Sequence, residues 1–100
     1  MRVGFFQFAP LFGEVSHNLD KIVDTLDQTD ADLIVLPELC ASGYQFVSQQ
    51  EVMTLSESVP KGPTTQRLIE LAKRRRMTIV AGLPERAGSA CYNEIGRAHV

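Results

Sequence analysis

Residues 33–39 read Leu33-Ile34-Val35-Leu36-Pro37-Glu38-Leu39, and this stretch decides how the rest of the chain is interpreted. Four apolar residues in a row are typical of a strand that is buried on both faces, as strands of parallel sheets are. Pro37 has no backbone N–H, so it helps to end the strand pairing. The sequence therefore predicts that an ionisable side chain, Glu38, stands at the end of a buried strand.

Two further apolar segments predict strands on either side of this one. Residues 2–9 (RVGFFQFA) are short, apolar and aromatic, and they end at Pro10. Residues 77–83 (MTIVAGL) read as another buried strand. The sequence thus predicts three strands, each separated from the next by a longer polar or amphipathic segment.

The intervening segments have the spacing of amphipathic helices. A first helix is predicted from four apolar residues at i, i+3, i+4 and i+7, with Ser16 or Asn18 as its cap. These four residues are Leu19, Ile22, Val23 and Leu26. A third helix is predicted over residues 64–76, after Pro63, and a short helix over residues 49–57.

The buried face of the helix over residues 64–76 is predicted to consist of Leu68, Leu71, Ala72 and Ile69. Its last turn carries the cations of residues 73–76, which complement the helix dipole and are expected to be solvated. The resulting order, β-α-β-(α)-α-β, predicts an α/β fold with right-handed crossovers and a largely parallel sheet.

Composition narrows the class of protein. The chain has 100 residues, 44% of them hydrophobic and 22% charged, which fits one globular domain or part of a larger one. A net charge of −2 gives no electrostatic reason to expect nucleic-acid or membrane partners. No apolar run approaches the roughly 20 residues of a membrane span. With two cysteines and no export signal, we expect a reducing, cytoplasmic location.

The position of Glu38 has chemical consequences. Ligands of open α/β sheets bind outside the carboxyl ends of the strands, where Glu38 is predicted to lie. A carboxylate placed there can serve as a general base. The residues alone leave a structural alternative open, in which Glu38 caps a turn or pairs with a lysine at the sheet edge.

The LIVLPEL segment with Glu38 resembles the catalytic glutamate motif of the nitrilase superfamily, the carbon–nitrogen hydrolases. Other segments resemble that family in the expected order, so the resemblance covers about residues 2–93. These segments are VGFFQFAP (3–10), NLDKI (18–22), GYQF (43–46), GPTTQRLIELAKRRRMTIVAGLPER (62–86) and YN (92–93).

The resemblance implies that this chain is the N-terminal part of an αββα sandwich. The family uses a Glu-Lys-Cys triad, which implies that Glu38 is the general base. It further implies a small-molecule amide, N-carbamoyl or nitrile substrate, no metal or organic cofactor, and homo-oligomers of the full-length protein. By the same resemblance, Tyr44 is expected to line the substrate pocket.

The family's lysine and nucleophilic cysteine have no counterparts at matching positions, since both would follow residue 93. Cys40 lies two residues from Glu38, but we interpret it as a small buried hydrophobic residue rather than a nucleophile. Cys91 is likewise interpreted as structural. A general base without its nucleophile has nothing to activate, so the chain alone is expected to be inactive.

The sequence of the last residues points to an origin outside the gene. Residues 95–100, IGRAHV, can be back-translated as ATC GGA AGA GCA CAC GTC, which is the sequence of a widely used sequencing adapter. We therefore expect residues 1–93 to belong to the hydrolase domain and residues 94–100 to be a tail that is not native.

Two other classes of function are alternatives to the hydrolase. A small flavodoxin-like or Rossmann-like nucleotide-binding module requires a glycine-rich loop after the first strand. Residues 10–13 (PLFG) contain neither GxGxxG nor GxxxxGK[ST]. A structural domain without any site is the other alternative, and the tolerance of Glu38 to substitution distinguishes it from an enzyme.

Overall fold

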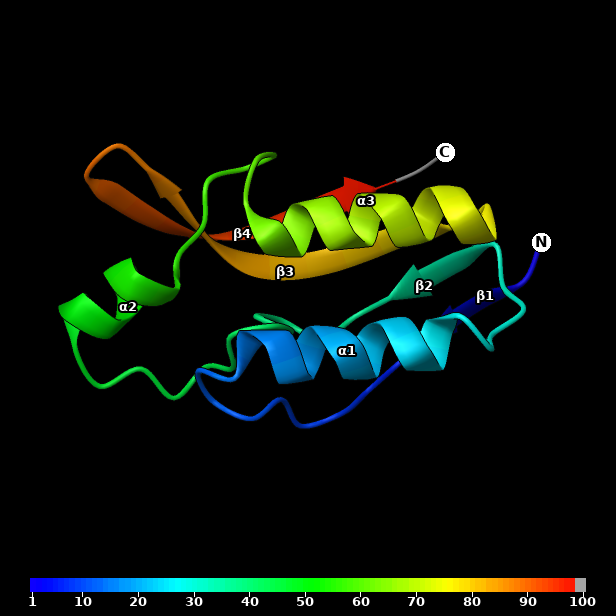
Figure 1. The fold of residues 1–100 in the computed structure, drawn as a ribbon, viewed down its shortest axis with the longest axis horizontal. Coiled ribbons are helices and arrows are strands. Elements are labelled where there is room, and N and C mark those ends of the chain that lie inside the picture. Colours follow the sequence, from blue (N-terminus) through cyan, green and yellow to red (C-terminus); the bar gives the residue numbers. More distant parts are fainter. Residues whose placement is uncertain (99–100) are drawn as a thin grey trace.

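The computed structural model describes residues 1–98, which form one four-stranded sheet and three helices (Figure 1). The elements in chain order are β1 (Val3–Phe5), α1 (Val15–Leu26), β2 (Leu33–Val35), α2 (Gln49–Leu55), α3 (Pro63–Arg75), β3 (Thr78–Ala87) and β4 (Ala90–Ala98). The predicted α/β class, the order of elements and the parallel pairing of the first three strands are confirmed. None of the helices in the described part of the chain is long and apolar enough to cross a membrane.

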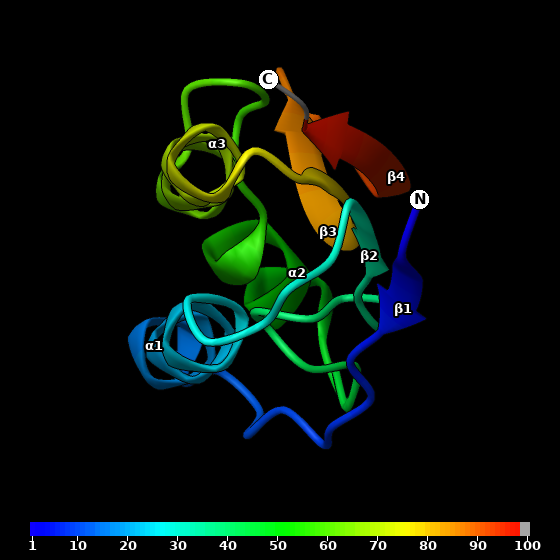
Figure 2. The same ribbon diagram turned by 90° about the vertical axis from the view of Figure 1, so that its right-hand side faces the viewer.

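The strands lie in the order β1-β2-β3-β4, with β1, β2 and β3 parallel and β4 antiparallel to β3. Because spatial order follows chain order and crossovers share one hand, both crossover helices are placed on the same face of the sheet. Figure 2 shows α1 and α3 together on that face. The strand order never reverses, so the switch point at which Rossmann-like sheets bind nucleotides is absent from the described residues.

The hydrophobic core lies between the two long helices and the sheet. The helix α1 buries Leu19, Ile22 and Leu26, as its spacing predicts. The helix α3 buries Leu68, Leu71 and Ala72, with Ile69 half-buried at the edge. The sheet contributes Ile34, Leu36, Ile79 and Ala81.

Two ion pairs join the solvent side of α1 to α3. Arg67 lies 2.8 Å from Asp20, and Arg74 lies 2.9 Å from Asp27. These four side chains are each more than a third exposed, so solvent screens the pairs and they contribute little to stability.

The opposite face of the sheet is bare. Its apolar side chains are exposed: Val3 to 65%, Phe5 to 75%, Val35 to 40% and Ile95 to 77%. The apolar run of β2 predicts cover on both faces, but the described residues cover only the face that carries the helices. The reason is topological, since both crossovers return over the same side.

The N-terminus of α1 differs from the prediction. The helix begins at Val15, its N-cap is Glu14, and Glu14 makes no side-chain capping hydrogen bond. Asn18 is therefore inside the helix and Ser16 is an exposed residue of its first turn, so neither caps it. Tertiary contacts of Asn18, described below, determine its position instead.

The N-terminus of α3 is capped by a residue from outside the helix. Glu57 accepts hydrogen bonds from the Thr64 backbone N–H at 2.8 Å and from the Thr64 hydroxyl at 2.5 Å. A negative carboxylate at this end satisfies free amides and complements the helix dipole. Gly62 makes this approach possible, because a Cβ on Gly62 would lie 2.6 Å from the Glu57 carboxylate.

Candidate active site

Glu38 lies in the loop that follows β2, at the carboxyl end of the parallel strands. The last ladder bond before it runs from the Leu36 N–H to the Val80 carbonyl at 2.8 Å. After Glu38 the chain turns sharply, with Leu39 in the left-handed region at φ 49°, which is uncommon for a non-glycine residue. The Cys40 N–H then donates to the Gly82 carbonyl at 3.1 Å, so the loop folds back onto β3.

Gly82 is the residue of β3 over which this loop passes. A Cβ at position 82 would lie 3.0 Å from the Glu38 Cα and 3.0 Å from the Leu39 nitrogen. Both neighbours are backbone atoms, which cannot rotate away from such a contact. The absence of a side chain at Gly82 therefore determines how closely Glu38 approaches the sheet.

The carboxylate of Glu38 meets the side chain of Asn93, which comes from β4. The Asn93 Nδ2 donates a hydrogen bond to the Glu38 Oε1 across 55 residues of sequence. Both side chains are exposed and border a cavity of about 410 Å³ on the bare face of the sheet. The remaining lining residues of this cavity are Val35, Leu36, Val80, Ala81, Gly82 and Ile95.

The loop beyond Glu38 is held by Asn18, which is buried beneath it. Its Nδ2 donates to the Ala41 carbonyl at 2.6 Å and to the Leu11 carbonyl at 2.9 Å. Its Oδ1 accepts from the Leu11 N–H at 2.9 Å. One buried amide thus ties α1 to the loops that follow β1 and β2, and its polar groups are satisfied in the way that burial requires.

Cys40 is fully buried, as the sequence predicts. Burial, reinforced by the nearby Glu57 carboxylate, raises the pKa of the Cys40 thiol to about 12. A thiol that remains protonated at neutral pH is a poor nucleophile, because the thiolate is the reactive form. Cys91 is half-buried, and its Sγ lies 3.2 Å from the Met53 Sδ, which agrees with a structural role.

The other candidate residues lie away from Glu38. Tyr44 is 62% exposed on the loop after Glu38 and does not line the cavity beside it. In the cationic segment, Arg74 pairs with Asp27, and the Arg75 Nη2 donates to the Thr29 carbonyl at 3.0 Å. The basic run is thus a solvated helix end, as predicted.

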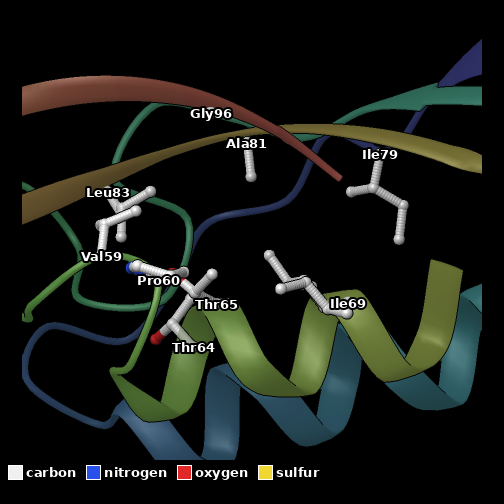
Figure 3. A pocket seen from close by; sticks show the side chains of 10 residues that line it. Val59, Pro60, Thr64, Thr65, Ile69, Ile79, Ala81, Leu83 and Gly96 are labelled. Carbon is white, nitrogen blue, oxygen red and sulfur yellow. The ribbon is translucent and has the colours of Figure 1, made fainter. Parts of the chain in front are cut away.

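A second cavity, of about 230 Å³, lies between α3 and the strands β3 and β4 (Figure 3). Its lining is almost entirely apolar and includes Leu68, Ile79, Leu83 and Gly96. None of the described residues that line it has a titratable side chain, and the thickness of the sheet separates it from Glu38. We interpret it as a packing defect rather than part of the site.

Comparison with known proteins identifies the family. Residues 2–95 match the family described as "Carbon-nitrogen hydrolase". The chain belongs to the carbon–nitrogen hydrolase family. The predicted membership in the nitrilase superfamily is thereby confirmed.

Among curated relatives of this carbon–nitrogen hydrolase chain is the nitrilase of Pyrococcus abyssi, 33% identical over 96 residues, which are 93% of this chain and 37% of the relative. Another is the "Hydrolase in pqqF 5′region" of Pseudomonas protegens, which is 38% identical over 97 residues; these are 95% of this chain and 33% of the relative. The protein N-terminal amidase of Schizosaccharomyces pombe is 30% identical over 92 residues, which are 85% of this chain and 32% of the relative. The chain spans about a third of the length of these relatives.

Solved structures show the same fold. An N-terminal amidase superimposes with a TM-score of 0.89 at 20% identity, covering 98% of this chain and 25% of that one. Nit3 of Saccharomyces cerevisiae, a member of the nitrilase superfamily, superimposes with a TM-score of 0.81 at 26% identity, covering 99% and 40%. The nitrilase-like fold predicted for this carbon–nitrogen hydrolase chain is thus confirmed.

Sequence reasoning placed Glu38 correctly at a strand end but assigned no role to Gly82 or Asn93. The signal for Gly82 was a glycine inside an otherwise apolar strand, which often marks a close backbone approach. In the sequence, Asn93 belongs only to the short YN segment (92–93) that resembles the family. Its proximity to Glu38 depends on the register of the β3–β4 hairpin, in which Asn93 pairs with Pro84.

Proposed function

We propose that the full-length protein hydrolyses the non-peptide C–N bond of a small amide, an N-carbamoyl compound or a nitrile through a Glu-Lys-Cys triad in which Glu38 is the general base. The chain belongs to the carbon–nitrogen hydrolase family, and the observation that supports the proposal most directly is where Glu38 lies in the fold. Its carboxylate stands at the carboxyl end of β2 beside a cavity of about 410 Å³.

In the proposed reaction with an amide, Glu38 accepts the proton of a cysteine thiol supplied by a part of the protein outside this chain. The sulfur attacks the carbonyl carbon, and the lysine ammonium stabilises the resulting oxyanion. The C–N bond breaks as Glu38 returns the proton to the leaving nitrogen, which leaves a thioester. Water then attacks the thioester carbon, Glu38 takes a proton from the water, and that proton returns to the sulfur.

The chain by itself is proposed to be inactive. Of the two cysteines, Cys40 is buried with a raised pKa, and Cys91 contacts Met53 instead of Glu38. The chain spans about a third of the length of its relatives, which supports the proposal that the second half of the sandwich and the other two triad members belong to a longer protein.

The domain boundary remains a prediction: residues 1–93 belong to the hydrolase domain and residues 94–100 are not native. The family match ends at residue 95, close to this boundary. Residues 99–100 lie outside the described residues. Resequencing the locus tests the prediction, because a genomic clone with the same codons followed by a true stop would refute it.

The base assignment is tested by Glu38→Gln in the protein encoded by the uninterrupted reading frame. Ammonia release from a panel of amides and nitriles is expected to fall about 100- to 10,000-fold, since the side chain of glutamine cannot accept the thiol proton. Glu70→Gln, at an exposed position of α3, is the matched control and is expected to retain activity. Full activity of Glu38→Gln would remove Glu38 from the mechanism.

Three finer assignments are part of the same proposal. Tyr44 is proposed to contact substrate in the full-length protein, and Tyr44→Ala is then expected to raise KM more than it lowers kcat. The full-length protein is proposed to form homo-oligomers, which sedimentation would show. Cytoplasmic location and the absence of nucleic-acid or membrane partners also remain predictions from the sequence.

A further inference from the structure

The side chain of Asn93 contacts the carboxylate of Glu38 directly. Among the side chains of residues 1–96, the amide of Asn93 is the one that forms a hydrogen bond with the Glu38 carboxylate. A carboxylate only accepts hydrogen bonds, so the amide nitrogen of Asn93, and not its oxygen, must face Glu38. The contact is therefore directional and charge-assisted.

The fold brings this pair together by a specific arrangement of three segments. The strand β3 lies between β2 and β4, so the loop after β2 has to cross β3 to reach β4. Gly82 permits this crossing, because the loop backbone occupies the space that a side chain at position 82 would fill. Asn93, close to Gly82 on the neighbouring strand, lines the same cavity and meets the carboxylate from the far side.

We propose that Asn93 is a positioning residue, which fixes the rotamer of Glu38 by donating to Oε1 and so keeps Oε2 directed at the reacting thiol. This inference rests on the proposed role of Glu38 as general base. A glutamate side chain has three rotatable bonds, and an exposed one samples many rotamers unless a partner holds it. A general base acts only when it lies within hydrogen-bond reach of the proton it takes.

The test is the isosteric substitution Asn93→Asp in the full-length protein, compared with Asn93→Ala. Aspartate keeps the shape of asparagine but loses the donor and places a second negative charge against Glu38. We expect kcat to fall about 10- to 100-fold at neutral pH, with KM changed less than about threefold. We also expect activity of the Asp variant to recover partly at lower pH, where the two carboxyl groups can share a proton.

If Asn93 positions Glu38, Asn93→Asp lowers kcat more than Asn93→Ala does. A purely structural role for Asn93 predicts the reverse order. Aspartate would then be tolerated better than alanine, because it fills the same volume. An Asp variant with wild-type kcat and an unchanged pH profile would overturn the inference. Gln28→Glu, an amide-to-acid change at an exposed residue just after α1, controls for the added charge.

Failure of this inference is distinguishable from failure of the proposed function. If Glu38→Gln abolishes activity and Asn93→Asp has no effect, Glu38 is the base and Asn93 does not position it. If Glu38→Gln has no effect, the function assigned to Glu38 is wrong, and the inference about Asn93 fails with it. Far-UV circular dichroism of both Asn93 variants verifies that they fold.

Discussion

At the scale of single residues, burial decides which of two neighbouring ionisable groups can be reactive. Glu38 is exposed beside a cavity, whereas Cys40, two residues later, is fully buried. Because the thiol of Cys40 has its pKa raised from 9.0 to about 12, it stays protonated in the folded state. Between these two pH values the unfolded chain loses a proton that the folded chain keeps, so stability falls as pH rises.

This difference predicts the order of thiol modification. With iodoacetamide at pH 8, half-buried Cys91 is expected to react first, and Cys40 only when the chain unfolds. Mass spectrometry of peptides after timed quenching measures both rates, with urea-unfolded chain as the reference. If Cys40 in the folded chain reacted as fast as in urea, it would be an accessible thiolate, and its exclusion as nucleophile would be wrong.

At the scale of elements, the hairpin β3–β4 contains two interior glycines, of which one has no space for a side chain and the other does. Gly82 lies directly under the Glu38 loop, where no side chain fits. Gly96 faces the cavity of about 230 Å³ beneath α3, and a Cβ there would touch only Leu83, at an ordinary 3.9 Å. The fold therefore has room for an apolar side chain at position 96.

Gly96→Val is accordingly expected to stabilise the chain by about 1 kcal/mol, because it fills apolar space and stiffens a strand residue. The same change at Gly82 is expected to destabilise it by about 1–3 kcal/mol, since valine would collide with the Glu38 loop. Pulse proteolysis in urea measures both values. Destabilisation by Gly96→Val would mean that the cavity is not available to a side chain from β4.

At the scale of the whole molecule, the distribution of apolar surface is one-sided. Both long helices cover one face of the sheet (Figure 2). The apolar side chains of Val3, Phe5, Val35 and Ile95 on the other face are exposed. A contiguous apolar sheet face of this kind favours association with other surfaces. In the αββα sandwich of the family, a second sheet would cover this face.

The isolated chain is therefore expected to associate or precipitate, with sedimentation that depends on concentration. The double substitution Phe5→Lys and Ile95→Lys is expected to shift it toward monomer, because it places two charges on the bare face. Ile34→Lys, on the covered face, is the control and is expected to unfold the chain. A soluble wild-type monomer with a sharp cooperative melt would contradict this prediction.

Much of this architecture was predictable from local sequence patterns. The spacing of Leu19, Ile22 and Leu26 determines one helix face, and Pro63 marks the start of α3. The apolar run that ends at Pro37 predicts both a parallel strand and the exit of Glu38 from it. These features depend on residues within a few positions of each other, which periodicity and turn chemistry can register.

Only the tertiary structure decided the rest, because it depends on contacts between residues far apart in the chain. The capping of α1 was predicted wrongly, since Asn18 is committed to the carbonyls of Leu11 and Ala41. The meeting of Glu38 with Asn93, 55 residues away, follows from sheet order and hairpin register, neither of which any local pattern encodes. The sequence by itself determined that a carboxylate ends a buried strand. The packing of β3 and β4 around it determined which groups surround that carboxylate.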